Sequence, residues 1–167
     1  MSYLDNELAR IEKYIAGLGI KLIKKQKQDK GSETTDFGSW SPFEIELYVN
    51  EHNTTTDLIM TLLHEVGHHL YYQHNDKPPI PDEILISHDK MTKAQRKKIY
   101  DYEKSGIELM PTIAIELGLK IPLYKIYAHS ELDRWFYEVF YETGKFPLVK
   151  DRKKKKQELM KLYKGKK

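Results

Sequence analysis

One helical segment near the middle of the chain constrains the fold more than any other feature of the sequence. Apolar residues recur at helical spacing between Asp57 and Gln73, and Thr54 followed by Asp57 supplies the hydroxyl and the early acid that favour a helix N-terminus. The proline-rich residues 77–81 end the helix. The helix is expected to bury Leu58, Ile59, Leu62, Leu63, Val66 and Leu70. A helix with so many large apolar side chains has to lie against the core.

The same helix carries the segment His64–His68, which reads His-Glu-Val-Gly-His. Two histidines four residues apart lie on one side of a helix, close enough to bind one metal ion. Zinc favours nitrogen ligands, and a catalytic zinc site keeps one position for water. Glu65 adjoins the first histidine, so its carboxylate can take a proton from that water and later give it to a leaving amine. The segment therefore predicts Zn²⁺ bound by His64 and His68, with Glu65 as the catalytic base.

The absence of cysteine narrows the choice of any further ligand. Disulfides, thiolate zinc sites and cysteine nucleophiles are excluded, so a third protein ligand has to be His, Asp or Glu. With 167 residues, 40% of them hydrophobic and 32% charged, the chain has the composition of a globular domain. Its apolar runs are short and its N-terminus has no apolar signal region, so we expect a cytoplasmic protein without a membrane span.

Charge divides the chain into two parts. Residues 150–167 contain ten Lys or Arg and two acidic residues, a balance of +8, whereas residues 1–149 have a balance of −5. We therefore expect a single domain over residues 1–149 and a basic C-terminal tail over residues 150–167. The tail is either a solubilising, partly disordered terminus or a contact for nucleic-acid phosphates or an acidic protein. No base-reading motif accompanies it.

The N-terminal part is expected to form one helix and two strands. Helical spacing extends over Tyr3–Leu18, and a strand is expected over Ile20–Lys25. Apolar and acidic residues alternate over Phe43–Val49, which is typical of a strand with one wet face. The polar residues 26–41 between the strands are expected to form a loop.

The C-terminal part is expected to be helical. Residues 92–117 have a helical pattern that Gly106 and Pro111 should divide. A further helix is expected to begin near Ser130, where Ser130 and Asp133 make a capping box, and to end near Thr143.

The motif in this context resembles the zincin metallopeptidases, and the strand, the capped helix and the sequence Leu62–Leu70 are similar to the ImmA/IrrE-type family. The similarity covers about residues 43–72. It implies a zincin-like α+β fold, in which a small β-sheet packs on the motif-bearing active-site helix and further helices follow. It also implies hydrolysis of a peptide bond in a protein substrate, such as a regulatory partner, with Phe43–Val49 in a sheet whose edge aligns the substrate.

The resemblance further implies a glutamate on a later helix as the third zinc ligand. Glu131 is the first choice, because the segment from Ser130 is similar to the family's Glu-x-x-Ala-(Asn/Asp/Trp) helix, with Arg134 in place of the small residue. The segment Leu109–Pro111 is similar to the Leu-Met-Pro that follows the ligand helix in the family, but that alignment puts Tyr100 at the ligand position. The alternatives to Glu131 are Asp133 and Glu138 and, with a shift in alignment, Asp101 and Glu103.

The other histidines and the tyrosines leave the remaining roles open. Acyl transfer needs a donor for the developing oxyanion, and His129, Tyr127 and His88 are candidates among which the spacing does not choose. His69 points about 100° further round the helix than His68, so we expect it outside the metal site. The histidines expected at the surface are His52, His74 and His88.

These features together predict a gluzin-like zinc metallopeptidase acting on a protein or peptide. Two other classes stay open: a catalytically silent zincin-fold protein that binds or regulates a partner, and a nucleic-acid-associated protein acting through the basic tail. The presence of Glu65 favours the enzyme. The short chain argues against a broad digestive protease, because little of it is left to build a deep cleft.

Overall fold

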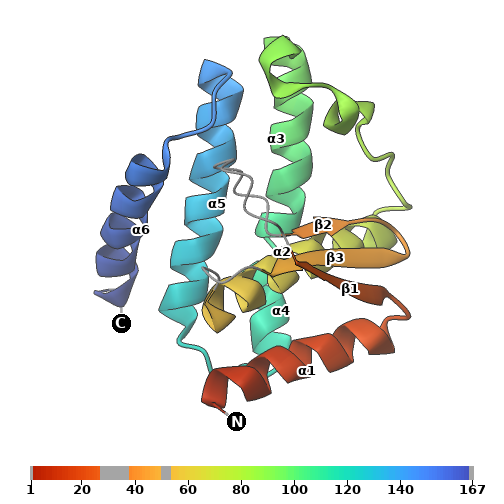
Figure 1. Ribbon diagram of the computed structural model, residues 1–167, viewed down its shortest axis with the longest axis vertical. Coiled ribbons are helices and arrows are strands. Elements are labelled where there is room, and N and C mark those ends of the chain that lie inside the picture. Colours follow the sequence, from red (N-terminus) through yellow and green to blue (C-terminus); the bar gives the residue numbers. More distant parts are fainter. Residues whose placement is uncertain (1, 27–37, 50–53, 166–167) are drawn as a thin grey trace.

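The computed structural model describes residues 2–26, 38–49 and 54–165. Within these residues the chain has the expected α+β class, with a three-stranded mixed sheet and six α-helices (Figure 1). The elements in chain order are α1 (Tyr3–Gly17), β1 (Lys21–Gln26), β2 (Gly38–Trp40), β3 (Glu44–Val49), α2 (Thr55–His74), the 3-10 helices η1 (Asp82–Leu85) and η2 (His88–Lys90), α3 (Lys93–Ile107), α4 (Met110–Glu116), α5 (Leu123–Thr143) and α6 (Val149–Lys164). No helix in these described ranges is long and apolar enough to cross a membrane.

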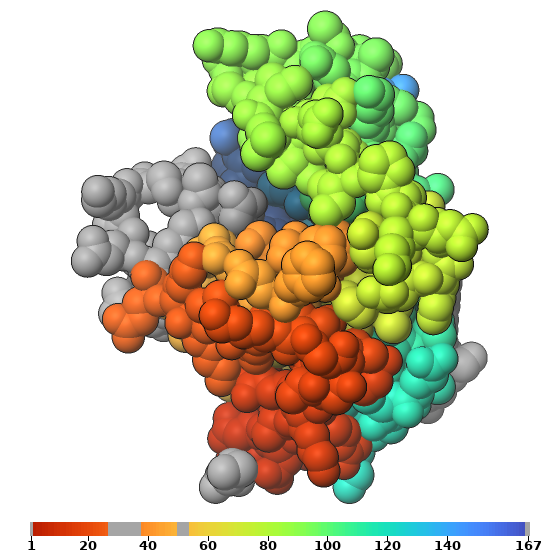
Figure 2. All heavy atoms as spheres, turned by 90° about the vertical axis from the view of Figure 1, so that its right-hand side faces the viewer, coloured from red at the N-terminus to blue at the C-terminus, as the bar shows by residue number. Residues whose placement is uncertain are grey.

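The central strand of the sheet is β3. Strand β1 runs parallel to it, with Lys21 opposite Glu44, and β2 runs antiparallel to it, with Trp40 opposite Ile45. On β3, Ile45 and Leu47 are fully buried while the alternate residues keep some exposure, which is the pattern that predicted this strand. Figure 2 shows the strands at the surface of one side of the molecule, between α1 and the segment 75–92.

Strand β2 lies inside residues 26–41, so the prediction of a loop there is wrong for Gly38–Trp40. Three residues are too few for an alternating pattern to appear in the sequence. The glycine has a packing reason: a Cβ added at Gly38 would lie 2.7 Å from Cγ2 of Thr61 on α2. The backbone of β2 therefore lies close against α2. Residues 27–37 of the predicted loop lie outside the described residues.

Helix α2 begins as the sequence predicts, with a reciprocal capping box. The Thr54 hydroxyl accepts a hydrogen bond from the backbone N–H of Asp57 at 3.2 Å, and the Thr54 backbone N–H donates to the Asp57 carboxylate at 3.1 Å. The helix ends at His74, and Asp76 and Lys77 then adopt positive φ values of 53° and 54°. These residues turn the chain away before the proline-rich segment.

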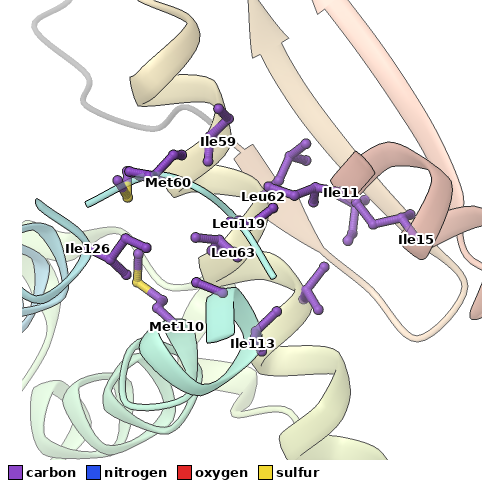
Figure 3. Packing of buried hydrophobic residues seen from close by; sticks show 14 of the residues in the cluster. Ile11, Ile15, Ile59, Met60, Leu62, Leu63, Met110, Ile113, Leu119 and Ile126 are labelled. Atoms are coloured by element: carbon purple, nitrogen blue, oxygen red, sulfur yellow. The ribbon is translucent and has the colours of Figure 1, made fainter. Parts of the chain in front are cut away.

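The hydrophobic core surrounds α2 (Figure 3). Leu62 and Leu63 of α2 are fully buried, and the side chains that meet this helix come from several parts of the chain. They include Ile11 and Ile15 of α1, Ile45 and Leu47 of β3, Met110 and Ile113 of α4, and Ile126 of α5. The polar side chains in the middle of α2 are therefore largely removed from bulk water and need partners inside the protein or in a cavity.

The prediction that the long C-terminal helix begins at Ser130 is wrong, because α5 begins at Leu123 after Pro122. Ser130 lies inside this helix, where its hydroxyl donates to the Ile107 carbonyl of α3 at 3.1 Å. Its side chain thus links α5 to α3 instead of capping a helix. The predicted division of residues 92–117 is confirmed by the break between α3 and α4.

The basic residues 150–167 fall largely within α6, which packs along α5 (Figure 1). Leu159 of α6 is buried against Ala128 and Leu132 of α5. Arg152 and Lys156, from the same helix, reach carboxylates of α5 and α2. In this structure α6 is an integral layer on the domain of residues 1–149.

Candidate metal centre

Three side chains from α2 and α3 converge with metal-ligand geometry. Oε2 of Glu103 lies 3.2 Å from Nε2 of His64 and 3.4 Å from Nε2 of His68. Donor atoms of a tetrahedral zinc site with bonds of about 2.0–2.1 Å lie about 3.3 Å apart, so both distances fit one shared ion. Among the described residues, these three form the group whose ligand atoms all lie within 4.8 Å of one another.

Burying these three polar side chains costs free energy unless they share a metal ion or a proton. His64 and His68 are 9% and 4% exposed, and Nδ1 of His68 is buried without a hydrogen-bond partner. Burial opposes the charged form of His64, but the carboxylates of Glu103, Glu65 and Asp133 outweigh it and raise its pKa to about 9. Burial likewise favours neutral Glu103, but the two imidazoles outweigh it and lower its pKa to about 2. The carboxylate is therefore held in the form that binds a cation.

A close crossing of α2 and α3 brings the ligands together. A Cβ added at Gly67 would lie 2.2 Å from the Gly106 carbonyl oxygen, and one added at Gly106 would lie 2.9 Å from ring atoms of His68. Both helices thus need glycine at the crossing. Gly106 stands three residues after Glu103, so one face of α3 makes the contact with α2 and also supplies the carboxylate.

We expect Gly67→Ala to destabilise the fold by about 1–3 kcal/mol, because the new methyl group would push the two helix backbones apart. A loss of stability would be informative, because alanine is otherwise favoured over glycine inside a helix by about 1 kcal/mol and would be expected to stabilise it. Urea denaturation monitored by circular dichroism measures the difference. Gly17→Ala at the end of α1 is the matched control, because nothing lies within 4 Å of a Cβ there. Equal stability of both variants would contradict the close crossing.

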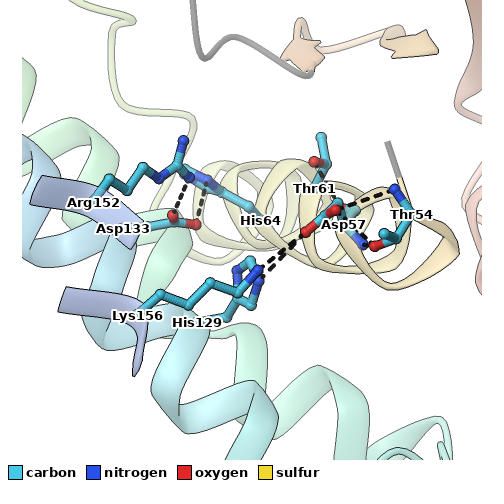
Figure 4. Close-up of polar contacts among 8 residues, drawn as sticks. All are labelled: Thr54, Asp57, Thr61, His64, His129, Asp133, Arg152 and Lys156. Carbon is cyan, nitrogen blue, oxygen red and sulfur yellow. Dashed lines mark hydrogen bonds and ion pairs between the residues drawn. The ribbon is translucent and has the colours of Figure 1, made fainter. Parts of the chain in front are cut away.

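A second layer of side chains holds the ligands in place. Oδ2 of Asp133 lies 3.9 Å from Nδ1 of His64, and Arg152 of α6 donates to Oδ1 of Asp133 at 3.2 Å (Figure 4). The ring of His68 stacks on Tyr102 with centroids 4.3 Å apart. A carboxylate behind a histidine ligand favours the tautomer whose other nitrogen is available to a metal. Asp133 lies on the Nδ1 side of His64, and at 3.9 Å it makes an electrostatic contact and not a hydrogen bond.

Glu65 and the ligand trio face a cavity of about 650 Å³. Glu65 is 8% exposed, and Gly38 of β2 lies so close that an added Cβ would be 3.2 Å from Oε1 of Glu65. The wall combines Gly38 and Trp40 of β2 with residues of α2, α3, α5 and α6. Glu65, the predicted general base, and His64 and His68, two of the three predicted metal ligands, therefore open onto the same space.

The structure does not bring Glu131 to this group. Its carboxylate pairs with Arg134 on the same helix, and Glu131 is absent from the residues that line the cavity. Among the alternatives, Glu138 is exposed and Asp101 pairs with Lys97 at the surface of α3. Asp133 approaches His64 from the side away from Glu103. Glu103 is the carboxylate that the structure places beside both histidines.

The remaining candidates take several positions. His129 is buried in the cavity wall, whereas Tyr127 is exposed and stacks on Tyr163. His88 packs edge-on against Phe140 and Phe146 and also lines the cavity. His69 is buried beside Trp40, outside the ligand group as expected. The other two are His74, which is exposed, and His52, which lies outside the described residues.

Comparison with known proteins identifies no relative of this chain. No family model matches the sequence, and neither a curated protein nor a solved structure matches the chain.

Proposed function

We propose that this protein is a zinc-dependent peptidase of the zincin type, in which His64, His68 and Glu103 hold the metal and Glu65 is the catalytic base. The observation that carries the proposal is the approach of one Glu103 oxygen to both imidazoles, at 3.2 and 3.4 Å, in the wall of a cavity that Glu65 also lines. Two nitrogens and one carboxylate oxygen are a ligand set that zinc hydrolases use.

Zinc bound by these three residues would supply a Lewis acid that acidifies a water molecule near neutral pH. Glu65 would take the proton of that water and pass it to the amine that leaves when the peptide bond breaks. Asp133 would favour a proton on Nδ1 of His64 by electrostatic attraction across 3.9 Å, which leaves Nε2, the nitrogen near Glu103, available to the metal. Metal binding, proton transfer and the orientation of His64 would each be carried out by a side chain that the fold holds in the cavity wall.

A peptide suits the space around the site better than a compact small molecule. A second cavity of about 460 Å³ lies next to the first and shares Trp40, His68 and Tyr102 with it as lining residues. An extended chain would occupy both cavities, with residues on either side of the bond to be cleaved. Because β3 is the central strand and β2 lies at the sheet edge beside the cavity, β2 takes the substrate-aligning role expected of Phe43–Val49.

The placement of α6 also bears on the alternative of nucleic-acid binding. Arg152 pairs with Asp133 at 3.2 Å and Lys156 with Asp57 at 3.4 Å, and both basic residues line the cavity. These two basic side chains of the tail are directed into the fold. They favour a contribution of α6 to the site over a contact with nucleic-acid phosphates.

The test is metal removal. Protein stripped of metal with a chelator should not cleave a mixed library of peptides, and one equivalent of Zn²⁺ should restore cleavage detected by mass spectrometry. One equivalent of Mg²⁺ is the control and should not restore it, because magnesium prefers oxygen ligands in octahedral geometry. Failure to bind zinc at one ion per chain, or cleavage that survives chelation, would overturn the proposal.

A further inference from the structure

The cavity has a second polar region beside the metal centre, formed by α2, α5 and α6. It consists of Asp57, His129, Asp133, Arg152 and Lys156, and is called the basic corner below (Figure 4). His129 is only 6% exposed, neither ring nitrogen has a hydrogen-bond partner, and Nε2 lies 3.8 Å from Oδ1 of Asp57. A buried imidazole that makes no hydrogen bond costs free energy, so a hydrogen-bond partner that enters the cavity would stabilise this side chain.

Positive charge exceeds negative charge in this part of the wall. Lys156 Nζ lies 3.4 Å from Oδ1 of Asp57, and Arg152 pairs with Asp133. Each acid is therefore paired with one lysine or arginine, and each also lies near a histidine, His129 for Asp57 and His64 for Asp133. Lys153, the next lining residue of α6, adds a third cation. Burial lowers the pKa of His129 to about 4, so its neutral ring offers one N–H donor near pH 7. The surplus of donors and positive charge matches a carboxylate.

The basic corner lies a short step from the metal centre. His129 precedes Asp133 by four residues on α5, and Asp133 faces His64; Asp57 precedes His64 by seven residues on α2. With a helical rise of about 1.5 Å per residue, these separations are about 6 Å and about 10 Å. An extended peptide advances about 3.3 Å per residue, so the corner lies about two or three residues from the scissile bond.

We propose that the basic corner binds a carboxylate of the substrate, carried two or three residues from the bond that is cleaved. His129 and Lys156 donate to this carboxylate and Lys153 adds attraction. The carboxylate belongs either to an Asp or Glu side chain or to the C-terminus of the peptide. This inference rests on the proposed function, because it assigns the substrate class of the same site.

The test compares matched peptides with the zinc-loaded protein. One series replaces Gln by Glu at each position around the cleavage site, and a second carries either a free or an amidated C-terminus. We expect kcat/KM to rise about 10-fold or more for Glu at one position two or three residues away, or for the free C-terminus, which identifies the source of the carboxylate. Equal rates for all matched pairs would overturn the inference and leave the peptidase proposal standing.

Substitutions in α6 test whether the preference for an acidic peptide comes from the basic corner. Lys156→Gln should bring the ratio of kcat/KM between the acidic and the neutral peptide close to one, and Lys153→Gln should lower this ratio partly. Lys153 is exposed, so its variant tests the inference even where loss of the Lys156–Asp57 pair affects folding. Lys161→Gln is the matched control, because Lys161 lies on the same helix outside the cavity wall and should leave the ratio unchanged. An unchanged ratio in both cavity variants would contradict the assignment.

A binding measurement separates the two proposals when no peptide is cleaved. The imidazole NMR signals of His129 should shift on titration with acetyl-glutamate-amide and remain unchanged with acetyl-glutamine-amide. A shift that is lost in Lys156→Gln supports the basic corner even if the protein lacks peptidase activity. The absence of any difference between the two probes, in a protein that cleaves no peptide, would reject both.

Discussion

Replacing Glu65 with glutamine is expected to lower the rate of peptide hydrolysis by about 10²- to 10⁴-fold while zinc remains bound at one ion per chain. Glutamine has nearly the same size, so it fits the confined position beside Gly38, but its amide cannot take a proton from water. The residue lies between ligands on α2 without being one of the converging group. Metal content by mass spectrometry and kcat on one cleaved peptide measure the two effects separately.

The matched control for this substitution is Glu108→Gln. Glu108 is an exposed carboxylate that pairs with Lys104 on α3, and its loss should change neither zinc content nor rate. A Glu65→Gln protein that keeps zinc and cleaves as fast as the parent would show that another group is the base. Loss of zinc from Glu65→Gln would instead assign Glu65 a role in holding the metal.

Glu103→Gln is expected to weaken zinc binding by more than about 100-fold, because outer partners of metal ligands already contribute about 10- to 100-fold and Glu103 is proposed as a direct ligand. Its carboxylate is also the negative charge that faces both imidazoles, so the variant loses charge compensation as well as a donor atom. Competition with a chromophoric chelator gives the affinity. Circular dichroism establishes that the variant is folded.

The matched control is Glu131→Gln, which removes the carboxylate favoured by the family resemblance. Glu131 pairs with Arg134 outside the cavity, so zinc affinity should not change. The reverse outcome, with affinity lost in Glu131→Gln and kept in Glu103→Gln, would show that α5 supplies the third ligand. The two variants therefore show whether α3 or α5 supplies the third zinc ligand.

The pair His64 and His68 and the position of Glu65 could be predicted because they depend on one helix alone. Helical spacing places the histidines together, and the Thr54–Asp57 capping box determines where the helix begins. Both relations join residues that are close together in the sequence, so they do not depend on how distant segments pack. The structure agrees with them at the level of individual residues.

The third carboxylate could not be predicted in the same way, because its position depends on how two distant helices are rotated. On α5, Asp133 faces His64 whereas Glu131, two residues earlier, points about 200° away around the helix. The rotation of α3 about its own axis is set by the contact of Gly106 with α2. A glycine inside a helical pattern was the available signal, since it indicates a close approach, and Glu103 shares its face.

The start of α5 and the strand β2 escaped prediction for another reason. Ser130 has the composition of a helix cap, but its hydroxyl is used for a contact between helices, a choice that only the tertiary structure reveals. Strand β2 is held by pairing with β3 and by the absence of a Cβ at Gly38. Local propensity carries little information about such contacts.

In the proposed peptidase, the groups for bond cleavage and most of the groups for substrate selectivity would lie in different parts of the chain. The groups assigned to bond cleavage lie between His64 and Glu103, on helices held in the core, whereas three cations of the cavity wall lie on a single terminal helix that buries only Leu159. Substitutions of its exposed residues, such as Lys153, are expected to leave the packing around α2 intact. If the proposed function holds, the substrate preference could change through such substitutions while the metal centre stays the same.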